Sequence, residues 1–171
     1  ISMMEEQRER ALLVGVDTGE EQDFERSMEE LKSLAEACNM QVVGLITQKL
    51  VAVNKALYVG TGKVVEIKEF AAECEADIII SFEKLEAGRY AKYLKKDGKI
   101  VVNTQQIDPM PVIIGAAEYP TEVLSEISGK GLKVEEMDAL SLAIQAGTPK
   151  AVNIVLMGKA AKYFDIPYES W

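Results

Sequence analysis

A glycine-rich segment is the first place in this chain where a ligand can be expected. Gly60, Thr61, Gly62 and Lys63 precede residues 64–74, whose apolar spacing predicts a helix. Backbone N–H groups at a helix start carry partial positive charge and can bind an anion. A glycine turn that only sets the entry angle of the helix explains the same residues, since GxGK lacks the earlier glycine of a phosphate-binding loop.

Four polar residues are predicted to gather at one edge of a sheet. Asp17 and Thr18 end the first predicted strand, and Asn103 and Thr104 end the fourth. Parallel strands end on the same edge, which is where open α/β sheets bind their ligands. We expect a small polar pocket there, able to hold a solute.

Groups that usually carry catalysis or bind metals are scarce. Glu83 and Glu86 can pair for acid–base chemistry, but a strand-end turn followed by a carboxylate in the first turn of a helix explains them as well. The chain has no histidine, so we expect neither a zinc site nor a Ser-His-Asp triad. Cys38 and Cys74 lack CxxC spacing and are interpreted as small apolar residues. The sequence therefore predicts no catalytic residue, no metal site and no cofactor.

Short apolar runs alternate with amphipathic stretches along the chain. The predicted strands cover residues 11–16, 41–47, 77–82, 99–103 and, at a sheet edge, 132–137. The predicted helices cover about residues 24–38, 64–74, 85–94, 120–129, 138–146 and 148–164. The first has an inner face of Phe24, Met28, Leu31, Ala35 and Cys38. Asp138 and Thr148 are expected to cap the last two helices, and the last is expected to lie deep against the sheet because it is apolar on most faces. This alternation is typical of a mostly parallel sheet with helices on both faces. We predict a single α/β domain over residues 1–171, a three-layer αβα arrangement with a doubly wound, Rossmann-like or flavodoxin-like sheet.

Composition limits the classes of function. The chain has 171 residues, 48% of them apolar and 27% charged, which is ordinary for a soluble globular protein. A formal net charge of −9, with no basic stripe, argues against binding to nucleic acid. The longest apolar runs are too short to span a bilayer and no secretory signal precedes the first strand. We therefore expect a cytoplasmic protein that binds neither membrane nor nucleic acid.

The first half carries four stretches of a recognisable kind: RALLVGVDTG, SMEELKSLAEA, VVGLITQ and YVGTGKVVEIKEFAAECEADI. On these, residues 8–75 resemble the N-terminal domain of the HflX family of ribosome-associated GTPases. A member of that family would continue with an acidic-aromatic turn, a helical hairpin and a separate G domain, and we find none of these after residue 75. No GxxxxGK[ST] loop occurs in the sequence, so we expect no nucleotide hydrolysis.

The second half carries a different set: ADIIISFEKLEAGRYAKYLKKDGKIVVNTQQIDPMPVIIG, AEYP and GTPKAVNIVLMGKAAKYF. On these, residues 76–171 resemble the small subunit of indolepyruvate:ferredoxin oxidoreductase and the equivalent gamma domain of 2-oxoacid:ferredoxin oxidoreductases. That family opens with a GxGGQG-type loop, whereas the corresponding turn here, residues 15–21, lacks it and contains Glu20 and Glu21. The resemblance implies that thiamine diphosphate and iron–sulfur clusters belong to other subunits or domains, and that a large oxidoreductase subunit is the partner.

The two resemblances are expected to meet within about residues 73–80, inside a buried strand of both families. A join there would preserve the sheet, so our first hypothesis is an engineered or recombined hybrid α/β domain without catalytic activity, which needs no partner. An accessory subunit of an indolepyruvate or 2-oxoacid:ferredoxin oxidoreductase is the first alternative. A ribosome-associated fragment of an HflX-type GTPase is the second. A homodimer through an exposed apolar patch is compatible with the first hypothesis.

Overall fold

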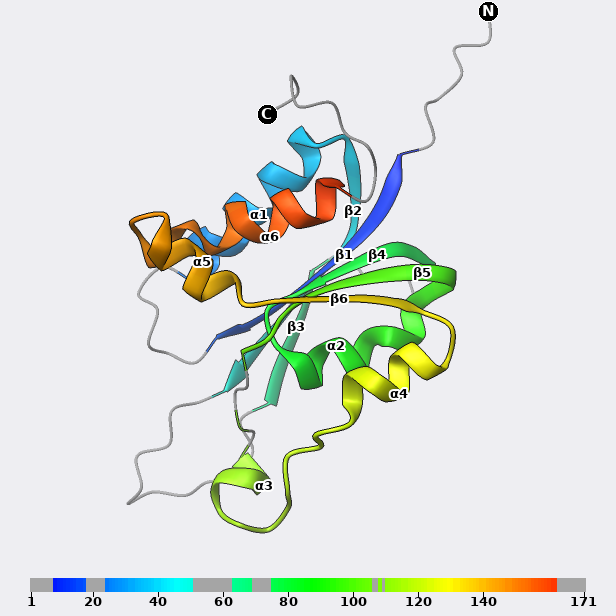
Figure 1. Ribbon diagram of the computed structural model, residues 1–171, viewed down its shortest axis with the longest axis vertical. Coiled ribbons are helices and arrows are strands. Elements are labelled where there is room, and N and C mark those ends of the chain that lie inside the picture. Colours follow the sequence, from blue (N-terminus) through cyan, green and yellow to red (C-terminus); the bar gives the residue numbers. More distant parts are fainter. Residues whose placement is uncertain are drawn as a thin grey trace, which may run out of the picture.

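The strands form a six-stranded sheet in the order β3-β2-β1-β4-β5-β6 (Figure 1). The structure is a computed structural model that describes residues 8–17, 24–50, 63–68, 75–105, 108 and 110–162. The strands are β1 (Glu9–Asp17), β2 (Met40–Leu50), β3 (Lys63–Lys68), β4 (Ala76–Ser81), β5 (Leu94–Asn103) and β6 (Lys133–Met137). β3 pairs antiparallel with β2, and the other neighbouring strands are parallel. The parallel strands alone have the order 2-1-3-4-5 of a flavodoxin-like sheet. The predicted fold class is confirmed.

Helices cover both faces of this sheet (Figure 1). One face carries α1 (Phe24–Ala37), α5 (Ala139–Gln145) and α6 (Val152–Lys162), and the other carries α2 (Lys84–Tyr90) and α4 (Val123–Gly129). Two short 3₁₀ helices, η1 (Ala91–Tyr93) and η2 (Pro149–Ala151), follow α2 and precede α6. The short helix α3 (Met110–Ile113) lies apart from both layers.

Alternate residues of the central strands supply two separate cores. Leu12, Ile79 and Ile100 are neighbours across β1, β4 and β5 and belong to the core beneath α2 and α4. Leu13 and Ile80, one residue further along, belong to the core beneath α1 and α6. Successive residues of a strand face opposite sides of a sheet, so a sheet covered on both faces requires continuous apolar strands. This is why ALLVGV and DIIIS read as buried runs.

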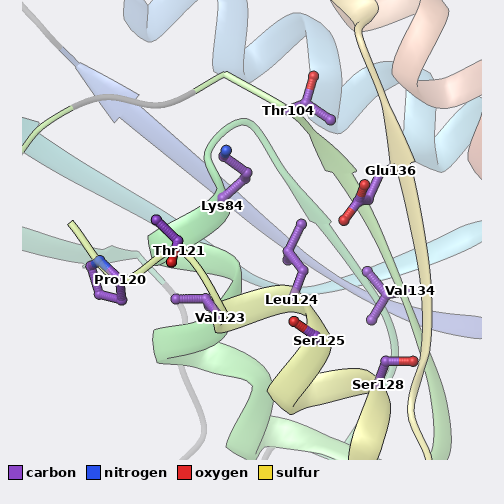
Figure 2. Close-up of a pocket in the computed structure, with 10 residues that line it drawn as sticks. All are labelled: Lys84, Thr104, Pro120, Thr121, Val123, Leu124, Ser125, Ser128, Val134 and Glu136. Carbon is purple, nitrogen blue, oxygen red and sulfur yellow. The ribbon is translucent and has the colours of Figure 1, made fainter.

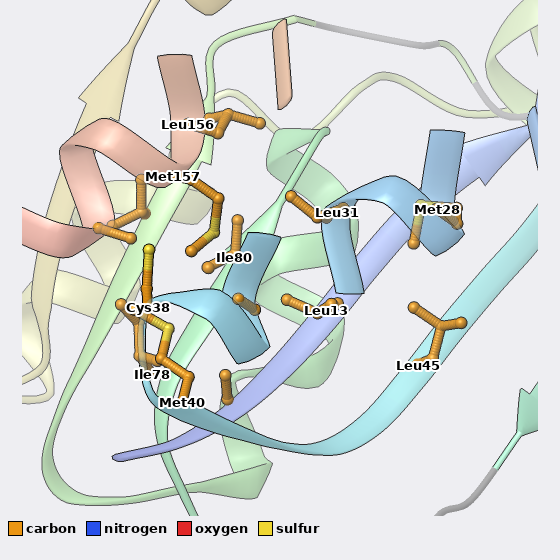
Figure 3. Packing of buried hydrophobic residues seen from close by; sticks show 14 of the residues in the cluster. Leu13, Met28, Leu31, Cys38, Met40, Leu45, Ile78, Ile80, Leu156 and Met157 are labelled. Carbon is orange, nitrogen blue, oxygen red and sulfur yellow. The ribbon is translucent and has the colours of Figure 1, made fainter. Parts of the chain in front are cut away.

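The core beneath α1 and α6 joins the two halves of the chain (Figure 3). Leu13 and Leu31 come from the first half, and Leu156 and Met157 from the second, and all four are fully buried. The inner face predicted for residues 24–38 is confirmed, because each of its apolar positions is buried. Strands and helices from both halves therefore share one set of packing contacts.

The stretch expected to form a second helix is a strand instead. β3 covers Lys63–Lys68 and lies antiparallel to β2, and residues 69–74 fall outside the described part of the chain. Val64 and Ile67 have the spacing of three that suits a helix, but Val65 and Ile67 have the spacing of two that suits a strand. β-Branched residues favour extended backbone, and the free edge of β2 offers a hydrogen-bonding partner. The predicted helix is wrong for residues 64–68.

The predicted start signals of the last two helices are confirmed. Asp138 Oδ1 accepts a hydrogen bond of 3.0 Å from the Ser141 N–H at the start of α5. The hydroxyl and the N–H of Ser141 both lower the pKa of this carboxyl. Thr148 Oγ1 accepts one of 3.2 Å from the Lys150 N–H at the start of η2. Each side chain supplies an acceptor to an N–H group that has no partner within the helix.

Two helices of the second half differ from the sequence prediction. The helix expected to begin at Pro120 begins at Val123, because residues 121–122 form a turn. The last helix is apolar on most of its faces and is expected to lie deep against the sheet. α6 does bury Leu156, but Ile154 remains 55% exposed on the side facing away from the sheet. In the described part of the chain, no further layer covers that side.

Charged groups cluster at the amino ends of β1 and β4. Asp77 Oδ2 accepts a hydrogen bond of 2.7 Å from the Arg10 N–H, and Asp77 Oδ1 forms an ion pair with Lys95. Burial raises the pKa of Glu9, and the charge of Asp77 raises it further, while Lys95 and Lys99 act in the opposite direction. The charged form of Glu9 is therefore disfavoured by folding.

Replacing Glu9 by glutamine is expected to stabilise the protein at neutral pH. A carboxyl whose pKa is raised by folding lowers stability above that pKa, and this penalty disappears below its ordinary value of 4.5. E9Q should raise the free energy of unfolding by less than about 1 kcal/mol at pH 7, and the gain should vanish near about pH 4. Urea denaturation at the two pH values measures this. Glu29→Gln, at an exposed position of α1, is the control, and a loss of stability in E9Q at pH 7 would contradict the prediction.

Candidate functional site

The sheet changes its direction of winding between β1 and β4, and a pocket of about 200 Å³ opens at the carboxyl ends of these strands. This is where an open α/β sheet binds ligands. Phe24 and Phe82 contribute aromatic surface to its lining, and Gln105 and Lys150 contribute polar groups. Asn153 also lines it, but Asn153 is 3% exposed and its Nδ2 donates to the Ser27 carbonyl oxygen at 2.8 Å. That amide ties α6 to α1.

A larger pocket, of about 500 Å³, lies on the opposite face between α4, β6 and the start of α2 (Figure 2). Lys84 and Glu136 bring opposite charges to it. Leu124 and Val134 provide apolar surface, and hydroxyl groups complete the lining at Thr104, Thr121, Ser125 and Ser128. Sequence reasoning did not find this pocket, because its residues are spread from position 84 to position 136 without a local pattern.

Of the four polar residues predicted to share a pocket, the structure describes three, and neither pocket above has Asp17 or Asn103 in its lining. Asp17 ends β1, and Thr18 lies outside the described residues. Asn103 is 1% exposed, and its Oδ1 accepts a hydrogen bond of 3.1 Å from the Ala139 N–H. Thr104 lines the larger pocket, on the other face of the sheet. Asn103 thus positions the start of α5.

The anion site predicted at residues 60–63 stays a prediction, although the helix expected after it is a strand. Gly60, Thr61 and Gly62 lie outside the described residues, and Lys63 begins the strand β3. A helix start presents several unpaired N–H groups with an aligned dipole, which is what binds an anion at such a point. A strand presents neither.

Glu83 and Glu86 both lie at the start of α2. Glu83 is the N-cap of α2, where its Oε2 accepts a hydrogen bond of 2.9 Å from the Glu86 N–H. Its Oε1 accepts a hydrogen bond from the Tyr119 hydroxyl, and that hydroxyl also accepts one of 3.1 Å from the Leu85 N–H. The Glu86 carboxylate lies 3.8 Å from Arg89 on the same helix. The interpretation of both residues as a strand-end turn and a helix start is confirmed.

Two tyrosines and a cysteine have a pKa that burial raises. Burial, together with the hydrogen bond to Glu83, raises the pKa of Tyr119 above its ordinary value of 10. Burial also raises the pKa of Tyr90, and the charge of Glu86 adds to this. The pKa of the buried Cys38 thiol is raised by burial as well. All three stay protonated at neutral pH, so none is activated as a base or nucleophile.

Within the described ranges, no group of three or more Cys, Asp or Glu side chains is arranged to hold a metal ion. No helix among those ranges is long and apolar enough to cross a membrane.

A family model described as the N-terminal region of GTP-binding GTPases matches residues 25–113, which is more than half of the chain. The chain belongs to this GTPase N-terminal family. The matched region runs from α1 through β2, β3, β4, α2 and β5 to α3. It includes the start of α2, with Glu83 and Lys84, but neither α4 nor β6.

Relatives of this GTPase N-terminal family member come from two groups. A GTPase HflX from Alkalihalophilus pseudofirmus is 38% identical over 100 residues, covering 58% of this chain and 24% of that protein. Indolepyruvate oxidoreductase subunits IorB are 36% identical over 95 residues in Archaeoglobus fulgidus and 44% identical over 92 residues in Pyrococcus horikoshii. Those two matches cover 54% and 50% of this chain, and 47% and 44% of the relatives. The chain therefore spans less than half the length of each of these relatives.

The dual resemblance is confirmed, but a sharp crossover is not. The family match continues to residue 113, well past the expected limit at residue 75. The shares covered by the HflX match and by the Archaeoglobus match, 58% and 54%, together exceed the whole chain, so the two matched stretches overlap.

Proposed function

We propose that this chain is a non-catalytic α/β component that works by binding a larger protein, with the large subunit of an indolepyruvate-type oxidoreductase as the first candidate. The observation that carries this is the distribution of exposed large apolar side chains among the described residues. They are Ile113, Ile114, Leu140, Leu142, Ile144 and Ile154. All six lie in the half that resembles the oxidoreductase subunits, which are named as parts of a multi-subunit protein.

The helix α5 concentrates this feature. Ala139 and Ala143 are fully buried, whereas Leu140 is 38% exposed and Ile144 is 56% exposed. Leu140 and Ile144 are four residues apart, so they lie on one face of the helix, one turn from each other. The alanines of α5 are therefore its buried residues, and its larger apolar side chains are exposed to solvent. Such a face is typical of a surface that a partner covers.

The absence of catalysis in this proposal is supported by the carboxylates and tyrosines already described. Glu83, the most suitable carboxylate for acid–base chemistry, is occupied as a helix cap and by Tyr119. The sequence contains no histidine to replace it. A component of this kind contributes by its contacts, not by its own chemistry.

The test is binding of the purified chain to a purified large oxidoreductase subunit. Leu140→Glu with Ile144→Glu should weaken the complex at least about tenfold, because two charges would be buried in an apolar contact. Gln145→Glu, which adds a charge on the same helix without removing an apolar group, should leave the affinity unchanged. Absence of a wild-type complex, or a complex that tolerates both glutamates, would contradict the proposal.

The family match favours a second candidate function, a ribosome-associated module of a GTPase. Co-sedimentation of the chain with ribosomes tests it, and the net charge of −9 leads us to expect release at moderate salt. The overlapping resemblances also support a third proposal, that the chain is an engineered or recombined hybrid without a partner. A folded chain that binds neither the oxidoreductase subunit nor the ribosome would favour this hybrid.

A further inference from the structure

We propose that the pocket between α4 and β6 binds a small zwitterion with an apolar side chain, the chemistry of an α-amino acid such as leucine. The pocket has a volume of about 500 Å³, within the range of roughly 300–1,000 Å³ found for small-molecule sites. This inference is independent of the docking surface on α5, since none of the exposed residues of α5 lines the pocket.

The two charges of the pocket come from separate elements. Lys84 begins α2 and Glu136 lies on β6, and both line the same space (Figure 2). Within the described part of the chain, neither side chain forms an ion pair. A ligand with one charge would satisfy only one of them, whereas a carboxylate and an ammonium on one molecule satisfy both.

The Lys84 ammonium lies against an aromatic ring. Its Nζ lies 5.9 Å from the centroid of the Tyr119 ring, within cation–π range. Tyr119 is in turn held by Glu83 and by the Leu85 N–H. This contact restricts the Lys84 side chain, which lines the pocket, and a restricted side chain loses less entropy when a ligand binds.

The remaining surface suits an apolar group flanked by hydrogen bonds. Leu124, 9% exposed, lies between Lys84 and Glu136 in the view of Figure 2, with Val134 beside it. An aliphatic side chain of a few carbons fits against these residues. Thr104 and Ser128 place hydroxyl groups at the pocket as hydrogen-bonding partners of the ligand's charged ends.

The experiment is a calorimetric titration of the isolated chain with leucine, isocaproate, which lacks the ammonium, and leucine amide, which lacks the carboxylate. Wild-type protein should bind leucine saturably and each analogue about fivefold more weakly, the loss of one partly exposed ionic contact. Lys84→Met should abolish the preference for leucine over leucine amide. Glu136→Gln should abolish the preference for leucine over isocaproate.

Matched controls are Lys133→Met and Glu126→Gln, which change the same charges at exposed positions outside the pocket lining. Both should bind leucine as the wild type does. The proposal is overturned if leucine gives no saturable binding up to about 10 mM, if isocaproate binds as well as leucine, or if either pocket variant keeps both preferences. It is also overturned if the control variants lose affinity to the same extent as the pocket variants.

Discussion

Leu156→Ala is expected to lower the free energy of unfolding by about 3 kcal/mol and to destabilise both halves of the chain together. Leu156 lies on α6, is fully buried, and belongs to the same core as Leu13 of β1 and Leu31 of α1. Removing its side chain leaves a cavity that these neighbours cannot fill without moving. The loss should therefore be felt in strands that are far from Leu156 along the sequence.

Urea denaturation followed by circular dichroism measures the loss of stability, and hydrogen exchange shows where it occurs. If residues 1–171 form a single domain, as we propose, amide exchange in β1 and β2 should accelerate as much as exchange in β5. Ile154→Ala removes a similar side chain from an exposed position of the same helix and should cost less than about 1 kcal/mol. Faster exchange confined to β5 and β6 would contradict the single-domain proposal.

Glu83→Ala is expected to cost about 3 kcal/mol of stability. The substitution removes the acceptor for the Glu86 N–H at the start of α2 and the acceptor for the Tyr119 hydroxyl. Loss of a helix cap costs about 1 kcal/mol, and loss of a hydrogen bond to a buried charged group about 2 kcal/mol. Thermal or urea unfolding of the variant provides the measurement.

Two further variants separate these contributions. Glu83→Gln keeps an oxygen acceptor for the helix N–H and should lose less stability than the alanine variant. Tyr119→Phe keeps the helix cap, removes the hydrogen bonds of the tyrosine hydroxyl, and should cost about 2 kcal/mol. A Glu83→Ala protein as stable as Tyr119→Phe would show that the cap contributes nothing, contrary to our expectation.

The raised pKa of Tyr119 adds a pH dependence to this test. Folding favours the protonated hydroxyl, so its contribution to stability is lost progressively as the pH rises above the ordinary value of 10. Tyr119→Phe should therefore lose less stability than the wild type between about pH 9 and pH 11. Some alkaline loss should persist in the variant, because the pKa of Tyr90 is raised as well.

Sequence patterns predicted the elements whose residues repeat with the period of the backbone. Phe24, Met28 and Leu31 recur at the spacing of a helix face, and all three are buried. The run of isoleucines in β4 predicted a central strand, since only a strand covered on both faces needs every residue to be apolar. KVVEIK fits both periods, so its state in β3 was decided by the adjacent edge of β2.

By itself, the sequence determined the flavodoxin-like class of fold, the faces that build its two cores and the caps of its last helices. Each of these depends on residues only a few positions apart, where backbone geometry imposes the spacing. Only the tertiary structure decided that Glu83 meets Tyr119, 36 residues further along, and that Lys84 and Glu136 line one pocket. These long-range contacts follow from the order of the strands in the sheet and from the face on which each helix packs. No short-range sequence pattern predicts them.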